Sequence, residues 1–103
     1  MFWEMEHVSE QDIKREKEKA RRLRQSQWWL RRIAGGVCYY CHRKVGRGQL
    51  TMDHVVPLSR GGSSRKGNIV PACKECNSKK TYLLPIEWEE YLRQLARRTP
   101  DDE

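Results

Sequence analysis

Residues 37–81 read VCYYCHRKVGRGQLTMDHVVPLSRGGSSRKGNIVPACKECNSKKT. Two Cys-x-x-Cys pairs frame this stretch, Cys38 with Cys41 and Cys73 with Cys76. The two-residue spacer lets both thiolates of a pair face one cation at about 2.3 Å, and four thiolates complete the tetrahedral shell of a structural zinc ion. The gap between Cys41 and Cys73 is longer than in a compact zinc ribbon, so we expect a further substructure between the pairs.

Two other chemistries stay open for these cysteines. Disulfides need an oxidising compartment, but residues 1–6 lack the basic and apolar regions of an export signal, which predicts a cytoplasmic protein. The run from Cys38 to His42 fits the Cys-x-x-Cys-His pattern of c-type haem attachment. A haem would need an apolar envelope and would leave Cys73 and Cys76 unexplained, so we expect His42 to be an exposed residue of a zinc knuckle.

The charge balance favours a polyanionic partner. The 103 residues include 21 Lys and Arg against 14 Asp and Glu, a net charge of +7. Nucleic acid is the commonest partner of so basic a chain, and a solvated basic surface is the alternative. No apolar run is long enough to span a membrane. Because 34% of the residues are charged and 37% hydrophobic, we expect a marginal core that needs an additional cross-link, such as a bound metal or a disulfide.

Three zones follow along the chain. Residues 1–36 are predicted to be a basic N-terminal helical arm, with one helix over 9–34 whose last turns, at Trp28 and Trp29, dock on the core while its first half is solvated. Residues 37–81 form the core of the molecule. Residues 82–103 supply a C-terminal helix over 85–98 that packs on this core through an apolar face made of Trp88, Tyr91, Leu92 and Leu95.

The segment between the cysteine pairs predicts a β-hairpin followed by a helix. Leu50–Val56 is strand-like, and Asn68–Val70 can return as the second strand, which Pro71 ends. The glycine-rich residues 60–67 between them indicate a flexible basic loop. Residues 73–80 can form a short helix, so the fold class is α+β.

Asp53 and His54 are the candidate chemical pair in this segment. A carboxylate is a hard ligand for Mg²⁺ or Mn²⁺, and a neutral imidazole can take a proton from water near pH 7. Phosphodiester hydrolysis needs both functions. Neighbouring side chains of a regular strand point to opposite faces, so the two can share a site only if the strand bends after them.

The order C-x-x-C, M-D-H-V-V-P-L-S-R-G-G, N-I-V-P-A-C-K-E-C-N-x-x-K resembles the zinc-containing HNH endonucleases. The resemblance covers about residues 37–81. It implies a ββα-metal (His-Me finger) fold stapled by a four-cysteine zinc site and flanked by the N-terminal and C-terminal helices.

The resemblance also implies a role for each motif residue. His54 is similar to the general base that activates water, and Asp53 to a ligand of the catalytic divalent ion. Asn68 matches the asparagine that orients the base by bonding to the loop backbone, and Asn77 the position of the second metal ligand. The structural zinc ligands would be Cys38, Cys41, Cys73 and Cys76. Asn68 and Asn77 could instead cap turns or a helix.

An amide at position 77 in place of histidine favours Mg²⁺ or Mn²⁺ as the catalytic ion.

The implied activity is endonucleolytic hydrolysis of DNA, by nicking or double-strand cleavage, with 5′-phosphate products. The alternatives are a non-catalytic zinc-stabilised nucleic-acid-binding module, an RNA-cleaving or toxin-like nuclease, and a protein-binding zinc ribbon. A monomer and a homodimer are both open. Phosphate contacts are expected from Arg60, Arg65, Lys66, Lys74, Lys79 and Lys80.

Overall fold

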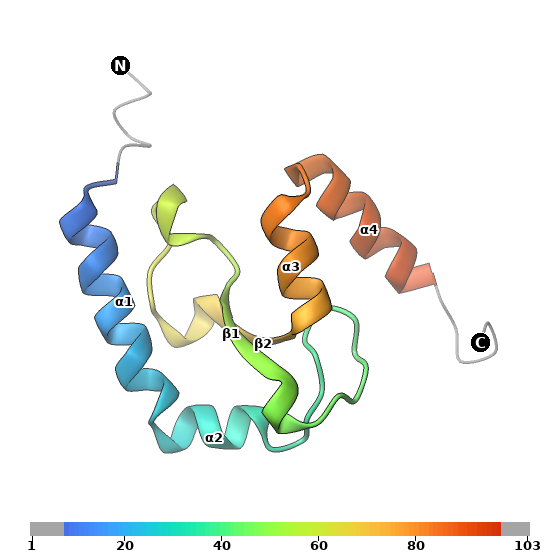
Figure 1. Ribbon diagram of the computed structural model, residues 1–103, viewed down its shortest axis with the longest axis horizontal. Helices are drawn as coiled ribbons and strands as arrows, with labels where there is room; N and C mark the ends of the chain where they lie inside the picture. The colour runs from blue at the N-terminus through green and yellow to red at the C-terminus, as the bar shows by residue number, and fades with distance from the viewer. Residues whose placement is uncertain (1–7, 98–103) are drawn as a thin grey trace.

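A two-stranded antiparallel sheet lies at the centre of the molecule, with two helices on each side of it (Figure 1). The computed structural model describes residues 8–97. Its elements are α1 (Glu10–Arg24), α2 (Gln27–Ile33), η2 (Arg47–Gln49), β1 (Leu50–His54), η3 (Leu58–Arg60), η4 (Lys66–Asn68), β2 (Ile69–Cys73), α3 (Lys74–Tyr82) and α4 (Pro85–Arg97). The sheet and α3 together form the predicted ββα unit, so the α+β fold class is confirmed.

The N-terminal arm contains two helices, which corrects the prediction of one continuous helix. The hydroxyl of Ser26 donates to the carbonyl of Leu23 at 2.6 Å and accepts from the N–H of Trp29 at 3.3 Å. Ser26 therefore closes the end of α1 and caps the start of α2, because its side chain offers the backbone partners that a continuous helix would supply. At the other end, the Oγ of Ser9 accepts from the N–H of Asp12 at 3.0 Å and caps the start of α1.

The first half of the arm is docked on the core, whereas the sequence predicted that it would be solvated. Ala20 is only 2% exposed, and α1 contacts η3 in the loop that follows β1. Figure 1 shows α1 running alongside this loop. The charged side chains next to Ala20 along the helix, Lys19 and Arg21, stay at the surface. Trp29 is 5% exposed and anchors α2, as predicted.

The second strand is longer than predicted, because it continues through Pro71 to Cys73. Proline has no N–H, and in a sheet it is tolerated only where that position faces away from the partner strand. Pro71 is paired with Met52 of β1, but its carbonyl accepts from the N–H of Tyr39 at 2.8 Å, on the side away from β1. The missing donor lies on that same side, so the sheet loses no hydrogen bond.

The core is built around the cysteines. Cys38 and Cys76 are fully buried, and Cys73 is 3% exposed. The apolar face predicted for the C-terminal helix covers this cluster: Trp88 and Tyr91 of α4 pack on it, with their rings 5.5 Å apart and stacked. Within residues 8–97, no helix has both the length and the apolar character needed to cross a membrane.

Candidate active site and zinc centre

Four sulfur atoms converge on one point. The Sγ atoms of Cys38, Cys41, Cys73 and Cys76 all lie within 4.8 Å of one another, and those of Cys41 and Cys73 are 3.8 Å apart. A tetrahedral zinc ion with bonds of about 2.3 Å requires sulfurs about 3.8 Å apart. The cluster therefore fits a metal ion held by four thiolates, as predicted from the spacing.

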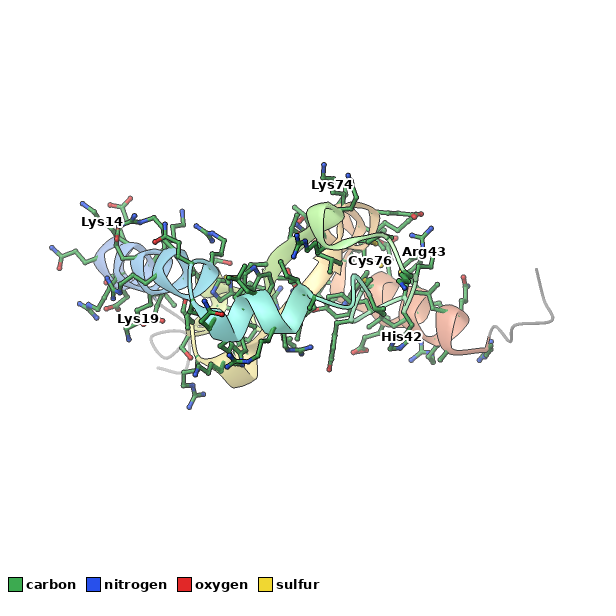
Figure 2. All side chains as sticks on the ribbon, turned by 90° about the horizontal axis from the view of Figure 1, so that it is seen from below. Lys14, Lys19, His42, Arg43, Lys74 and Cys76 are labelled. Carbon is green, nitrogen blue, oxygen red and sulfur yellow. The ribbon has the colours of Figure 1, made fainter. Side chains whose placement is uncertain are left out.

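The surroundings of the sulfurs favour a bound cation. Burial raises the pKa of the Cys38 and Cys76 thiols, so these groups need a nearby positive charge to ionise. Burial also acts on Cys41, but hydrogen bonds from Arg43, whose Nε lies 3.3 Å from the sulfur, lower its pKa to about 7. His42 is exposed in a left-handed conformation (φ 64°), as expected for a knuckle residue outside the ligand set. Figure 2 shows His42, Arg43 and Cys76 at the opposite end of the molecule from Lys14 and Lys19 of α1.

Asp53 and His54 line one cleft. They are the last two residues of β1, and the chain bends directly after them. This bend is the condition under which neighbouring residues can share a site. The cleft has a volume of about 550 Å³ and lies between the loop after β1 and the junction of α3 with α4. Its lining includes Arg60 and Lys80, together with Pro57, Leu58, Thr81, Leu83 and Trp88.

The carboxylate of Asp53 is held from two sides. Its Oδ2 accepts from the hydroxyl of Tyr40 at 2.6 Å and from the ammonium of Lys80 at 3.0 Å. Lys80 also donates to the backbone carbonyl of His54 at 2.7 Å, and its side chain is only 14% exposed. Burial and the neighbouring Asp53 raise the pKa of Tyr40, so its hydroxyl stays protonated and donates to the carboxylate. Asp53 therefore has a fixed orientation at the end of β1.

The imidazole of His54 is bound to Ser64 through Nε2, which lies 2.9 Å from the serine Oγ. The Ser64 hydroxyl gives its single hydrogen to the backbone carbonyl of Glu16 at 2.5 Å, because a carbonyl can only accept. The serine oxygen must then accept from Nε2–H. Nδ1 of the neutral ring is therefore the nitrogen without a proton. Burial lowers the pKa of His54, against the opposing effect of Asp53, so the neutral form is favoured.

The side chain of Asn68 ties the loop after β1 together. Its Oδ1 accepts from the N–H of Val56 at 2.8 Å, and its Nδ2 donates to the carbonyls of Val56 at 3.1 Å and Ser63 at 2.8 Å. Gly62 lies in the same loop, where an added Cβ would come within 1.8 Å of the Val56 carbonyl oxygen. The loop predicted to be flexible is thus closed by side-chain bonds and a close backbone approach.

Asn77 projects from α3 toward β1. Its Nδ2 donates to the Oγ1 of Thr51 at 3.1 Å, and the Thr51 hydroxyl itself donates to the carbonyl of Ala72 at 3.0 Å. Because the hydroxyl hydrogen is committed to Ala72, the threonine oxygen must accept from the amide nitrogen. This arrangement fixes the orientation of the amide and leaves its Oδ1 as the atom available to a hard cation.

The basic residues named as phosphate contacts are spread over several surfaces. Arg60 and Lys80 line the cleft. Lys66 lies over the ring of Trp28 at 5.7 Å, and Lys79 over that of Tyr91 at 5.1 Å. Arg65 is exposed and bonds to Ser63 at 2.9 Å, and Lys74 is exposed on α3.

Three contacts at the site were not foreseen from the sequence. Tyr40 reaches Asp53 from the segment between Cys38 and Cys41. Ser64 reaches His54 from the loop after β1, and Glu16 of α1 in turn bonds to Ser64. Tyr40 could have been suspected, because a residue inside a knuckle is brought to the core with its cysteines. The partnership of Ser64 with Glu16 joins residues 48 positions apart, and local sequence patterns carry no signal for it.

Comparison with known proteins agrees with this geometry. Residues 38–83 match the family model of the HNH endonucleases. The CRISPR-associated endonuclease Cas9 of Actinomyces naeslundii is 38% identical to this chain over 57 residues, which make up 54% of this chain and 5% of that protein. This chain thus corresponds to a small part of the relative. Residues 38–83, the part of the chain that matches the HNH endonuclease family model, carry the four cysteines together with Asp53 and His54 of the cleft.

Proposed function

We propose that the chain is a metal-dependent endonuclease that hydrolyses phosphodiester bonds of DNA, with His54 as the general base. The family match and the Cas9 relative support a nuclease-type function. The observation that carries the proposal is the cleft that His54 and Asp53 line together, combined with the hydrogen bond that commits the Nε2–H of His54 to Ser64. Nδ1 is then the free base of the neutral ring.

In the proposed reaction, His54 takes a proton at Nδ1 from a water molecule as the water oxygen bonds to phosphorus. The bond between phosphorus and the 3′-oxygen breaks, and the departing oxygen takes a proton from a second water molecule, which leaves a 5′-phosphate and a 3′-hydroxyl. Tyr40 and Lys80 hold the Asp53 carboxylate in place during this step. Asn68 keeps the loop that carries Ser64 closed over the ring.

Asp53 and Asn77 are the residues that would hold the catalytic cation. Lys80 and Tyr40 occupy only Oδ2 of Asp53, and Thr51 binds the amide nitrogen of Asn77. The Oδ1 atom of each residue therefore stays available, and such hard oxygens suit Mg²⁺ or Mn²⁺. A bound divalent ion would supply positive charge for the phosphate and the leaving oxygen.

DNA as substrate is supported by the charge of the chain and by the cleft lining. The net charge is +7, and Arg60 and Lys80 bring two cations to the cleft itself. Lys66, Lys79, Arg65 and Lys74 lie on other surfaces, where they would contact phosphates away from the scissile bond. Such contacts give affinity that falls with salt and carries little sequence information.

Incubation of supercoiled plasmid with the protein and either Mg²⁺ or Mn²⁺ tests the proposal. We expect nicked or linear DNA from the wild type and none from His54→Ala. His42→Asn is the matched control, because it replaces an exposed histidine with a residue that tolerates a positive φ. DNA binding with no metal-dependent cleavage would favour the non-catalytic zinc-stabilised module, and cleavage of RNA alone would reassign the substrate.

A further inference from the structure

We propose that Ser64 and Glu16 are positioning residues for His54, so that helix α1 is a working part of the active site. This inference rests on the proposed role of His54 as a base. It is carried by hydrogen bonds that run from α1 through the loop after β1 to the imidazole ring.

Two bonds fix Ser64 against α1. Its backbone N–H donates to Oε1 of Glu16 at 2.6 Å, and its hydroxyl donates to the backbone carbonyl of Glu16 at 2.5 Å. Ser64 is 6% exposed, and the side chain of Glu16 is 18% exposed, so water competes little for either group. The first bond sets where the serine backbone lies, and the second sets the direction of its hydroxyl. The serine oxygen therefore presents its lone pairs in one fixed direction.

That fixed oxygen is the partner of the His54 ring. Its distance of 2.9 Å to Nε2 holds the ring proton on that nitrogen and resists a flip of the ring, which would break the bond. The proposed base, Nδ1, consequently keeps both its protonation state and its place. Misplacement of a reacting group by about 1 Å can cost about a hundredfold in rate, so a rigid partner for the ring has a direct catalytic use.

The charge of Glu16 is suited to this task. The Ser64 N–H lowers the pKa of Glu16, despite the opposing effect of burial, so the group remains a carboxylate that accepts strongly. Two residues along the same helix, Glu18 makes an exposed ion pair with Arg21 and stays within α1. Glu18 is therefore a matched control that has the same residue type and the same helix without the contact to the loop.

Cleavage of a labelled DNA duplex by saturating protein in a single turnover tests the proposal. Ser64→Ala should lower the rate constant about ten- to hundredfold, the usual cost of losing a group that orients a functional side chain, with the half-saturating protein concentration unchanged. Glu16→Ala should lower it in the same direction. Glu16→Gln should retain most of the rate because it keeps an acceptor oxygen, and Glu18→Ala should match the wild type.

The His54 Nε2–H proton gives a readout that needs no substrate. An imidazole N–H is seen in NMR spectra only when a hydrogen bond protects it from exchange with water. We expect this resonance in the wild type, Glu16→Gln and Glu18→Ala, and its loss in Ser64→Ala. If the wild type cleaves no DNA, the proposed function fails, while the resonance still tests the contact itself.

Several results would overturn the inference. These are full cleavage by Ser64→Ala, equal effects of Glu16→Ala and Glu18→Ala, or an Nε2–H resonance that persists without the serine hydroxyl. Zinc content and melting temperature identify any variant that fails to fold. If Ser64→Ala is such a variant, the comparison of Glu16→Ala with Glu16→Gln decides the question.

Discussion

Removal of the metal from the four cysteines should unfold the HNH domain rather than loosen it. Cys38, Cys73 and Cys76 form a buried core cluster, and Trp88 and Tyr91 pack directly on them. Without a cation, burial keeps the thiols of Cys38 and Cys76 protonated, and the four sulfurs lose their common partner. The two-stranded sheet is too small to stay folded alone.

The free energy that a structural zinc ion contributes is as large as the whole free energy of unfolding of a typical domain. A structural zinc ion contributes about 10–16 kcal/mol of apparent binding free energy near pH 7. A natural domain is stable by only about 5–15 kcal/mol in total. Loss of the ion, or of one ligand in Cys76→Ala, should therefore leave residues 38–83 unfolded at 25 °C.

Circular dichroism during titration with a strong zinc chelator measures this effect, and elemental analysis measures the metal. We expect one zinc per chain, cooperative loss of structure on chelation, and recovery when zinc is returned. Ser78→Ala, on the exposed side of the same helix as Cys76, should melt like the wild type. Because protons compete with zinc for the thiolates, the metal should be held at neutral pH and released as pH falls. A metal-free protein with an unchanged melting curve would refute this reasoning.

Three further predictions concern residues in and around the candidate site. Tyr40→Phe removes the hydrogen bond to the Asp53 carboxylate and should lower the free energy of unfolding, measured with denaturant, by about 1.5–3 kcal/mol, whereas an unchanged value would show that this bond is not formed in solution. Gly62→Ala should reduce both melting temperature and cleavage, since its Cβ would lie 1.8 Å from a carbonyl oxygen of the same loop, while Gly67→Ala, with open space around it, should change neither. Burial lowers the pKa of His54 below the ordinary histidine value of about 6.5, and only the neutral ring can act as base. The cleavage rate should therefore persist as pH falls below about 6.5. A rate that falls to half its maximum at a pH above that value would be inconsistent with this account.

Patterns that act over a few residues were predicted well from the sequence. The two-residue spacing of the cysteines indicated a shared cation, and their sulfurs converge in the structure. The hairpin and the helix after it also follow from short-range signals, because strand and turn residues express their preferences locally.

Two local predictions were wrong because a partner outside the pattern decided the outcome. Ser26 is one of several polar residues in a helical run, yet its bonds to Leu23 and Trp29 divide the arm into two helices. Pro71 signals the end of a strand, but the strand continues because its missing donor faces away from β1, where Tyr39 bonds to its carbonyl. In both cases the hydrogen-bond partners, and not the residue type, determined the structure.

The candidate site also combines residues that the sequence predicted with contacts that it did not predict. Asp53 and His54 could be named from the motif, because the chemistry of an acid–imidazole pair is visible in the sequence. The contacts that hold them could not: Tyr40, Ser64 and Glu16 arrive from three other segments, and their approach depends on how α1 and the first knuckle pack. The roles of Asn68 and Asn77 remain predictions, although each amide has a defined set of partners.

The most direct test of the account compares DNA binding and DNA cleavage in the same zinc-replete samples of wild type and His54→Ala. Fluorescence anisotropy of a labelled duplex reports binding, and the rate of strand scission after addition of Mg²⁺ or Mn²⁺ reports chemistry. The account predicts equal affinity for the two proteins and scission by the wild type only. Equal scission rates, or no scission by a folded wild type with either metal, would contradict it.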